Sequence, residues 1–232
     1  MSRPPRPPSA RPAAGRAESV TLRKASGRSP SSQRWLTRQL NDPYVQAAQR
    51  EGWRSRAAFK LIELDARFHL LAPGMRVVDL GAAPGGWVQV ALHRGAARVV
   101  GLDLLPIAPI AGAELIEGDF TDPAMPGRLS RALGGGADLV LSDMAPNTTG
   151  HAATDHLRIL ALAEQALAFA LEVLTPGGAF VAKVFQGGAE RDLLMPMKSA
   201  FRSVRHAKPP ASRAQSVELY VIAQGYRPTR AP

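Results

Sequence analysis

Short apolar runs alternate with helical stretches after residue 73, and this alternation constrains the fold most. The runs are rich in β-branched residues and cover 76–80, 98–102, 114–116, 138–141, 179–184 and 217–223. Such alternation predicts parallel strands, because right-handed crossovers place the connecting helices on both faces of a sheet. We therefore predict an α/β domain with a doubly wound, mostly parallel sheet, whose last strand can run antiparallel.

Three helices are predicted around these strands. One begins at Trp35 and ends near Arg50, and a second lies within 55–64, with Ser55 placed to act as its N-cap. The longest covers 152–174 and stops at the Thr-Pro-Gly-Gly sequence of 175–178. Proline and glycine at that place predict a turn before the next strand.

A glycine-rich loop, Asp79-Leu80-Gly81-Ala82-Ala83-Pro84-Gly85-Gly86-Trp87, follows the first apolar run and precedes a helix. Glycines in such a turn let the backbone approach a nucleotide-type ligand closely. A P-loop is disfavoured because Trp87, and not Lys-Ser/Thr, follows Gly86. The glycine spacing also differs from the dinucleotide fingerprint, so an NAD-dependent oxidoreductase is a weak alternative.

Acidic residues occur at three predicted strand ends, at Asp79, Asp103 and Asp119. The carboxyl ends of parallel strands line one crevice, and an acid about 20 residues beyond the loop can accept hydrogen bonds from ribose hydroxyls. The acid at the next strand end can accept from an exocyclic amine. Each acid alone would be explained as a turn former or a helix N-cap, but three in register favour S-adenosylmethionine as the ligand.

Most of the net charge lies in the first 40 residues. They contain nine basic residues and one acid, whereas residues 41–232 contain 20 basic and 18 acidic residues. Paired prolines and the lack of apolar periodicity predict a disordered tail over 1–33, before a globular domain over 34–228. The tail would be attracted to RNA, although a solubilising extension or an organellar transit peptide would share its composition.

Several classes of site are excluded. The chain has no cysteine, so it has no disulfide framework, thiolate nucleophile or Cys-ligated zinc. The five histidines lack ligand spacing, and Met195, Met197 and Phe201 are expected to be core contacts, so we predict no metal. The sequence shows no run of 18 apolar residues and no signal peptide, so we expect a cytoplasmic protein without a membrane partner.

Further motifs occur near later strand ends. Ser142-Asp143-Met144-Ala145-Pro146-Asn147 follows the fourth run, and Lys183 lies within the fifth, where a lysine is costly unless it has a partner or a function. With Ser55-Arg56-Ala57, Lys60, the glycine loop and Asp103-Leu104-Leu105-Pro106, these motifs resemble the FtsJ-type ribose 2′-O-methyltransferases. The resemblance extends over about residues 35–226, in order, and is strongest to the bacterial branch that modifies large-subunit ribosomal RNA.

The resemblance implies a Rossmann-like methyltransferase fold with a tetrad around the acceptor ribose, formed by Lys60, Asp143, Lys183 and Glu218. It also implies that the methyl donor, S-adenosylmethionine, contacts Gly85, Trp87, Asp103, Asp119 and Asp143. The implied substrate is the 2′-hydroxyl of a uridine in large-subunit ribosomal RNA, within an assembled subunit, and we expect a monomeric enzyme. From spacing alone, Lys60 and Glu218 would be ordinary helix and strand residues.

The tetrad has two tasks in such a reaction. It must align the hydroxyl with the methyl group and the sulfur, and it must support loss of the hydroxyl proton. Lys183 either accepts this proton as a base or stays charged and stabilises the developing alkoxide. Asp143 and Glu218 would hold and orient the lysines in both cases.

The RNA surface is marked only by basic residues. Candidates are the segment 53–56, the helix carrying Arg34, Arg38 and Arg50, and the residues Arg202, Arg205, Lys208 and Arg213. Trp53 could stack on a base or anchor the N-terminal helix. Competing functions are 2′-O-methylation of transfer RNA or capped messenger RNA, and RNA binding without chemistry on the same fold.

Overall fold

The computed structural model describes residues 29, 33, 36–37, 39–146, 149–186 and 191–228. Of the predicted tail, only Ser29 and Gln33 are among the described residues. Arg34, Trp35 and Arg38 also lie outside the described residues. The candidate motif residue Asn147 also lies outside them.

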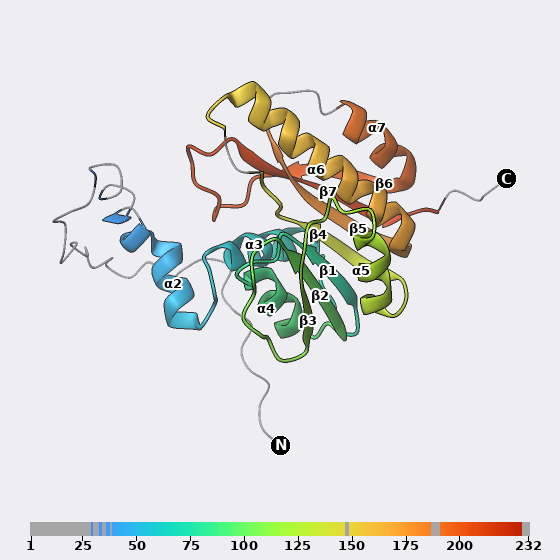
Figure 1. The fold of residues 1–232 in the computed structure, drawn as a ribbon, viewed down its shortest axis with the longest axis horizontal. Helices are drawn as coiled ribbons and strands as arrows, with labels where there is room; N and C mark the ends of the chain where they lie inside the picture. Colours follow the sequence, from blue (N-terminus) through green and yellow to red (C-terminus); the bar gives the residue numbers. More distant parts are fainter. Residues whose placement is uncertain are drawn as a thin grey trace, which may run out of the picture.

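The described residues form one seven-stranded sheet in the order β3-β2-β1-β4-β5-β7-β6 (Figure 1). The strands are β1 (Arg76–Leu80), β2 (Arg98–Asp103), β3 (Ala113–Glu117), β4 (Ala137–Ser142), β5 (Leu174–Phe185), β6 (Phe201–Ala207) and β7 (Glu218–Tyr226). The first five are parallel, whereas β7 runs antiparallel between β5 and β6. This confirms the predicted α/β class, the mostly parallel sheet and the reversed last strand.

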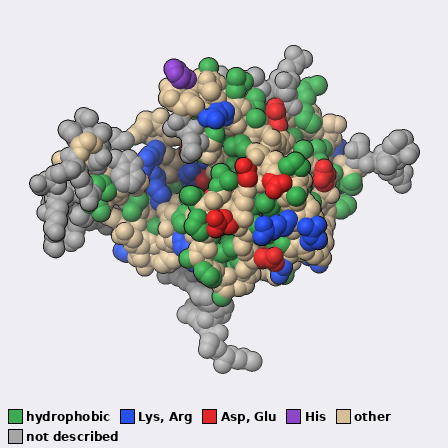
Figure 2. Space-filling view, viewed as in Figure 1, with side chains coloured by type: hydrophobic (Ala, Val, Ile, Leu, Met, Phe, Trp, Pro, Cys, Tyr) green, Lys and Arg blue, Asp and Glu red, His purple; other side chains and the backbone are tan. Residues whose placement is uncertain are grey.

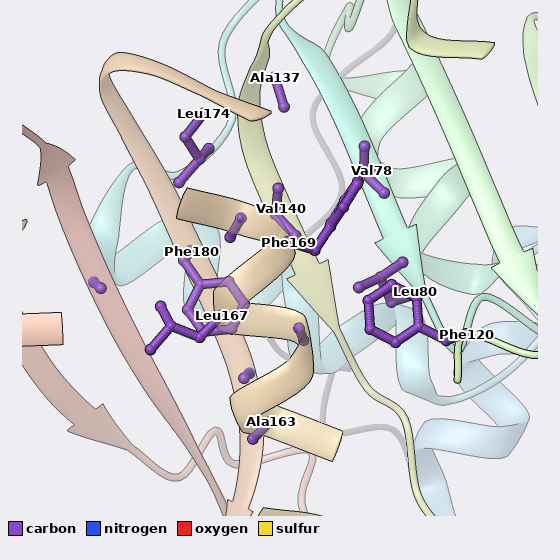
Figure 3. Packing of buried hydrophobic residues seen from close by; sticks show 14 of the residues in the cluster. Val78, Leu80, Phe120, Ala137, Val140, Ala163, Leu167, Phe169, Leu174 and Phe180 are labelled. Carbon is purple, nitrogen blue, oxygen red and sulfur yellow. The ribbon is translucent and has the colours of Figure 1, made fainter. Parts of the chain in front are cut away.

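The helices cover both faces of the sheet. They are α2 (Pro43–Glu51), α3 (Ala57–Phe68), α4 (Gly86–His93), α5 (Met125–Leu133), α6 (Ala152–Val173) and α7 (Arg191–Ala200). Successive strand residues point to opposite faces, so Val77 packs with α3 and α4, while Val78 packs with α5 and α6. Figure 3 shows the second cluster, in which Leu167 of α6 lies beside Phe180 of β5 and Phe169 of α6 lies near Val78 and Val140.

Two predicted local features are corrected. Ser55 is not the N-cap of α3: the helix begins after Arg56, and no side chain caps it. The Ser55 carbonyl accepts a turn hydrogen bond from Ala58, and its hydroxyl lies beside Gly86 at the start of α4. The turn predicted at 175–178 is part of β5, which already pairs at Leu174 and shifts register in this segment.

Two predictions near the C-terminus are also corrected. The sequence pattern did not predict β6, whose Arg202 and Arg205 interrupt any apolar run, because an edge strand needs fewer buried residues. Met197 and Phe201 are buried as expected, but Met195 is 61% exposed and is not a core contact. It lies on the solvent side of α7.

Candidate active site

The sequence order of the strands reverses between β1 and β4, and a crevice forms at such a point beyond the carboxyl ends of the strands. A cavity of about 460 Å³ lies there, within the size range of small-molecule sites. Its lining combines three acids with apolar side chains: Asp103, Asp119, Asp143, Leu104, Leu105, Phe120 and Met144. At Gly81, a Cβ atom would lie 2.8 Å from the Met144 amide nitrogen, so glycine permits this close approach of the loops.

The side chain of Asp103, at the end of β2, accepts hydrogen bonds from the backbone of two loops beside the cavity. Its Oδ2 accepts a hydrogen bond of 2.8 Å from the Ala83 amide, and its Oδ1 accepts one of 2.9 Å from the Leu105 amide. Each carboxylate oxygen has a second acceptor site. Asp103 therefore joins the glycine loop to the loop after β2 and can still accept from a ligand hydroxyl.

Asp119 lies on the same cavity wall after β3. Its Oδ1 accepts hydrogen bonds from the Thr121 hydroxyl at 2.7 Å and from the Thr121 amide at 2.8 Å. Both bonds lower the pKa of Asp119 below its ordinary value, and the bond from the hydroxyl has the larger effect. The residue is thus a fixed, ionised acceptor at the third strand end.

Gly85 and Trp87 are not among the residues that line this cavity. The Trp87 side chain is buried between α4 and α3, and its indole nitrogen donates a hydrogen bond of 2.8 Å to the Ala57 carbonyl. Its ring centroid lies 5.7 Å from that of Tyr220. The structure therefore places the Trp87 side chain under the tetrad and not in the cavity.

Asp79 is an unusual buried acid beneath the glycine loop. The residue is 1% exposed, and neither carboxylate oxygen has a hydrogen-bond partner among the described residues. Burial first, and then the nearby charges of Asp143 and Asp103, raise the pKa of Asp79 well above its ordinary value. This carboxyl group is the least satisfied polar group beside the crevice, and a cationic ligand group would relieve it.

The structure brings the four tetrad residues together from α3, β5, β7 and the loop after β4. Lys183 Nζ lies 3.1 Å from Asp143 Oδ1 and donates a hydrogen bond of 2.8 Å to the Asp143 carbonyl. Lys60 Nζ lies 3.6 Å from Asp143 Oδ2 and 3.6 Å from Glu218 Oε2. Asp143 thus lies between the two lysines.

Tyr220 is a site residue that the sequence reasoning did not identify. Its hydroxyl accepts a hydrogen bond of 3.0 Å from Lys60 Nζ and donates one of 2.7 Å to Asp143 Oδ1. The residue is fully buried, and burial, together with the negative charge of Asp143, raises its pKa well above the usual value. The one available signal was its spacing, since Tyr220 follows Glu218 by two residues on the same strand.

Electrostatics keep the central carboxylate ionised. Burial alone raises the pKa of Asp143. The ammonium groups of Lys183 and Lys60, and the hydrogen bond from Tyr220, outweigh burial and lower this pKa below its usual value. Asp143 is therefore a negative centre that two cations and one hydroxyl hold in place.

A second cavity of about 370 Å³ is lined by two other members of the tetrad. Its lining combines Lys60 and Glu218 with residues of α3 and of the segment before β7: Arg56, Ala57, Ala211, Arg213, Gln215 and Ser216. Glu63 holds that segment by accepting a hydrogen bond of 2.6 Å from the Ala211 amide. The tetrad thus lies between an acidic, apolar cavity and a basic, polar one.

Several predicted RNA contacts are engaged within the protein. Arg56 pairs with Asp42 at 2.8 Å, and Lys208 Nζ donates to the carbonyls of Ala214 and Ser216. Trp53 packs edge-on against His93 with ring centroids 5.9 Å apart, an arrangement that anchors it to α4. On the face shown in Figure 2, basic and acidic side chains are interspersed around α5, and no single charge dominates there.

No group of three or more potential metal ligands occurs among the described residues. No helix in the described part of the chain is long and apolar enough to cross a membrane.

Comparisons with known proteins identify the family of the chain. The chain is 69% identical over 215 residues to ribosomal RNA large subunit methyltransferase E of Gluconobacter oxydans (strain 621H), covering 93% of this chain and 80% of that one. It is 68% identical to the protein of that name from Granulibacter bethesdensis, covering 94% of each. A solved ribosomal RNA methyltransferase structure from Plasmodium falciparum superposes with a TM-score of 0.69 at 28% identity, over 76% of this chain and 100% of that one. The family model of FtsJ-like methyltransferases matches residues 53–226, and the chain belongs to this family of S-adenosylmethionine-dependent enzymes.

Proposed function

We propose that the protein transfers a methyl group from S-adenosylmethionine to the ribose 2′-hydroxyl of a uridine in large-subunit ribosomal RNA. The observation that carries this proposal is the tetrad of Lys60, Asp143, Lys183 and Glu218 between two cavities of different chemistry. The names of the relatives support a large-subunit ribosomal RNA substrate over transfer RNA or capped messenger RNA.

The acidic, apolar cavity suits the methyl donor. Asp103 would accept from the ribose hydroxyls and Asp119 from the exocyclic amine, while Leu104, Leu105 and Phe120 would pack against the base. Asp143 favours positive charge beside this cavity, and the donor carries both a sulfonium and an ammonium group. Gly85 and Trp87 would contribute through the loop backbone and through packing under the tetrad.

The basic cavity suits the acceptor nucleotide. A 2′-hydroxyl next to Lys60 and Lys183 is accompanied by the phosphate of its own nucleotide, and Arg213 stands on the cavity wall that would face this anion. Glu218 is the most exposed tetrad member, at 29% of its side chain, and would hold Lys60 toward the acceptor. The acceptor nucleotide would thus occupy the cavity beside Lys60 and Glu218, and the methyl donor the cavity beside Asp143.

The residues align the reaction and manage its charge. When bound, S-adenosylmethionine supplies an activated methyl group, so the enzyme mainly has to position the hydroxyl and stabilise its developing negative charge. Lys183 Nζ is held by two acceptors, the Asp143 carboxylate at 3.1 Å and the Asp143 carbonyl at 2.8 Å, so its position beside the reacting hydroxyl would be fixed. We therefore assign Lys183 to stabilising the alkoxide as the hydroxyl proton leaves to solvent, and Asp143 to orienting both lysines.

The closing test uses large ribosomal subunits from a strain that lacks the corresponding modification. The purified protein and labelled donor should introduce one 2′-O-methyl group into a uridine of the large-subunit RNA, and the K183A variant should not. Naked ribosomal RNA should be modified less well than the assembled subunit. If only transfer RNA or capped RNA is labelled, the proposed ribosomal substrate is wrong. If the protein binds the donor but transfers the methyl group to no RNA, it is not catalytic.

We also propose that the enzyme acts as a monomer in the cytoplasm, with a catalytic domain over 34–228 and an RNA-attracting tail over 1–33. The 24.7 kDa chain contains both cavities and the whole tetrad without a second copy. Light scattering should give the monomer mass, and a dimer mass would contradict this assignment.

A further inference from the structure

We propose that Arg54 is a positioning residue for the donor cavity and that phosphate binding is not its main role. Its guanidinium group donates three hydrogen bonds to backbone carbonyls from two loops. Nη1 donates to Pro84 at 3.1 Å and to Ala108 at 2.5 Å, and Nη2 donates to Pro109 at 2.8 Å. Pro84 belongs to the glycine loop, whereas Ala108 and Pro109 belong to the loop between β2 and β3.

The backbone of Arg54 is fixed as firmly as its side chain. Its amide donates a hydrogen bond of 2.8 Å to the Gln89 side chain, whose nitrogen donates one of 3.1 Å to the Gly52 carbonyl. Gln89 lies on α4, directly behind the glycine loop. The junction between α2 and α3 therefore holds Arg54 at a set distance from both loops.

The loop after β2 needs such an anchor. It has no helix or strand between Asp103 and Ala113, yet it carries two cavity-lining side chains, Leu104 and Leu105. These side chains are 66% and 63% exposed, so burial contributes little to holding them. Asp103 fixes one end of the loop through the Leu105 amide, and Arg54 fixes its middle.

Close packing supports this role. A Cβ atom at Gly85 would lie 2.6 Å from the Ile110 side chain and 3.2 Å from the Arg54 side chain. Glycine at this position, with φ of +109°, thus allows the loop and the guanidinium stem to meet over the glycine turn. The three parts pack together, and the two loops among them also carry the cavity-lining residues Ala83, Leu104 and Leu105.

The geometry distinguishes positioning from phosphate binding. An arginine that binds phosphate offers its planar donor face to the ligand, whereas Arg54 uses both terminal nitrogens on carbonyls of its own chain. Its loss should free the loop and lower the fraction of molecules with a formed cavity. Apparent donor affinity falls in proportion to that fraction.

The test measures S-adenosylhomocysteine binding by calorimetry in the absence of RNA. R54A should weaken binding by about tenfold, as a loop formed in about a tenth of molecules implies. In methylation assays, R54A should raise the KM for the donor by a similar factor and leave kcat at saturating donor within about threefold. A wholly structural defect would instead lower kcat and the thermal unfolding temperature.

R50A is the matched control, because Arg50 is an exposed basic residue at the end of α2 in the same region. R50A removes the same charge as R54A and should leave the affinity for S-adenosylhomocysteine unchanged. R54K keeps the charge but replaces the planar guanidinium group by a single ammonium group. This variant should retain its affinity for RNA and still bind S-adenosylhomocysteine several-fold more weakly.

The inference rests on the proposed donor cavity, and the two can fail separately. If the unmodified protein does not bind S-adenosylhomocysteine, the donor assignment fails. If it binds and R54A or R54K binds equally well without RNA, the Arg54 proposal is wrong. A rise confined to the KM for ribosomal RNA would overturn it in favour of a phosphate contact.

Discussion

The Tyr220 hydroxyl donates a hydrogen bond of 2.7 Å to Asp143 at the centre of the candidate active site. Because the same hydroxyl accepts from Lys60, three groups from α3, β7 and the loop after β4 form a continuous chain. Trp87 packs against the Tyr220 ring from below. The tetrad is therefore supported from inside the protein by the phenol of Tyr220 and the indole of Trp87.

Removal of this hydroxyl should shift the pH dependence of activity. In Y220F, Asp143 loses one of the hydrogen bonds that lower its pKa, so its pKa rises and the acid limb of the pH–rate profile moves toward neutral pH. A hydrogen bond to a charged group contributes about 1.5–3 kcal/mol, so kcat should fall by roughly 10- to 100-fold. Y226F is the control, because the Tyr226 hydroxyl donates to the Leu171 carbonyl away from the site. An unshifted acid limb in Y220F would remove Tyr220 from the mechanism.

Lys183 should be needed for transfer but not for donor binding. K183A should bind S-adenosylmethionine within a few-fold of the unmodified protein and lose methylation by a factor of at least about 10². Single-turnover kinetics on large subunits, with donor binding measured in parallel, will check this. Near-normal turnover of K183A would contradict any role of this residue in the reaction.

Asp103 should determine donor affinity. D103A removes the proposed acceptor for the ribose hydroxyls as well as the contacts to Ala83 and Leu105, so affinity should fall by about 10- to 100-fold. D103N keeps one carbonyl acceptor and should lose less. Calorimetric titration with S-adenosylhomocysteine measures both variants, and unchanged affinity of D103A would mean that the adenosine lies elsewhere.

The buried Asp79 should reduce stability as the pH rises. Its raised pKa means that the folded protein binds this proton more tightly than the unfolded chain does. Raising the pH above the unfolded pKa therefore costs stability until the folded pKa is passed. D79N resembles the protonated form, so it should unfold at a higher temperature than the unmodified protein at pH 7, and the difference should shrink toward pH 4. A D79N protein that is equally destabilised at every pH would contradict this sign.

The tail should add RNA affinity without changing the modified nucleotide. Deletion of residues 1–33 removes seven basic residues and one acid, so fewer counterions are released on RNA binding. The shortened protein should bind the methyl donor normally, and its RNA affinity should be lower and fall less steeply with salt. Parallel salt slopes for the two forms would show that the tail does not touch RNA.

Much of the fold follows from local pattern. Residues 76–80 were predicted as a strand with the bounds that β1 has, because an apolar β-branched run ends there at a glycine turn. The edge strand β6 and the start of β5 could not be predicted in this way. Arg202 and Arg205 conceal the first, and Pro176 with two glycines conceals the second. In both cases pairing with a neighbouring strand outweighs local preference.

The sequence by itself determined the class of the fold, the crevice at the strand ends and, through its motifs, the family. Only the tertiary structure decided that Tyr220 joins Lys60 to Asp143 and that Arg54 holds the donor loop. Tyr220 is separated from Asp143 by 77 residues, and Arg54 from Pro109 by 55. Periodicity shows which face of an element is buried, but hydrogen bonds between distant segments depend on how those segments are brought together in space.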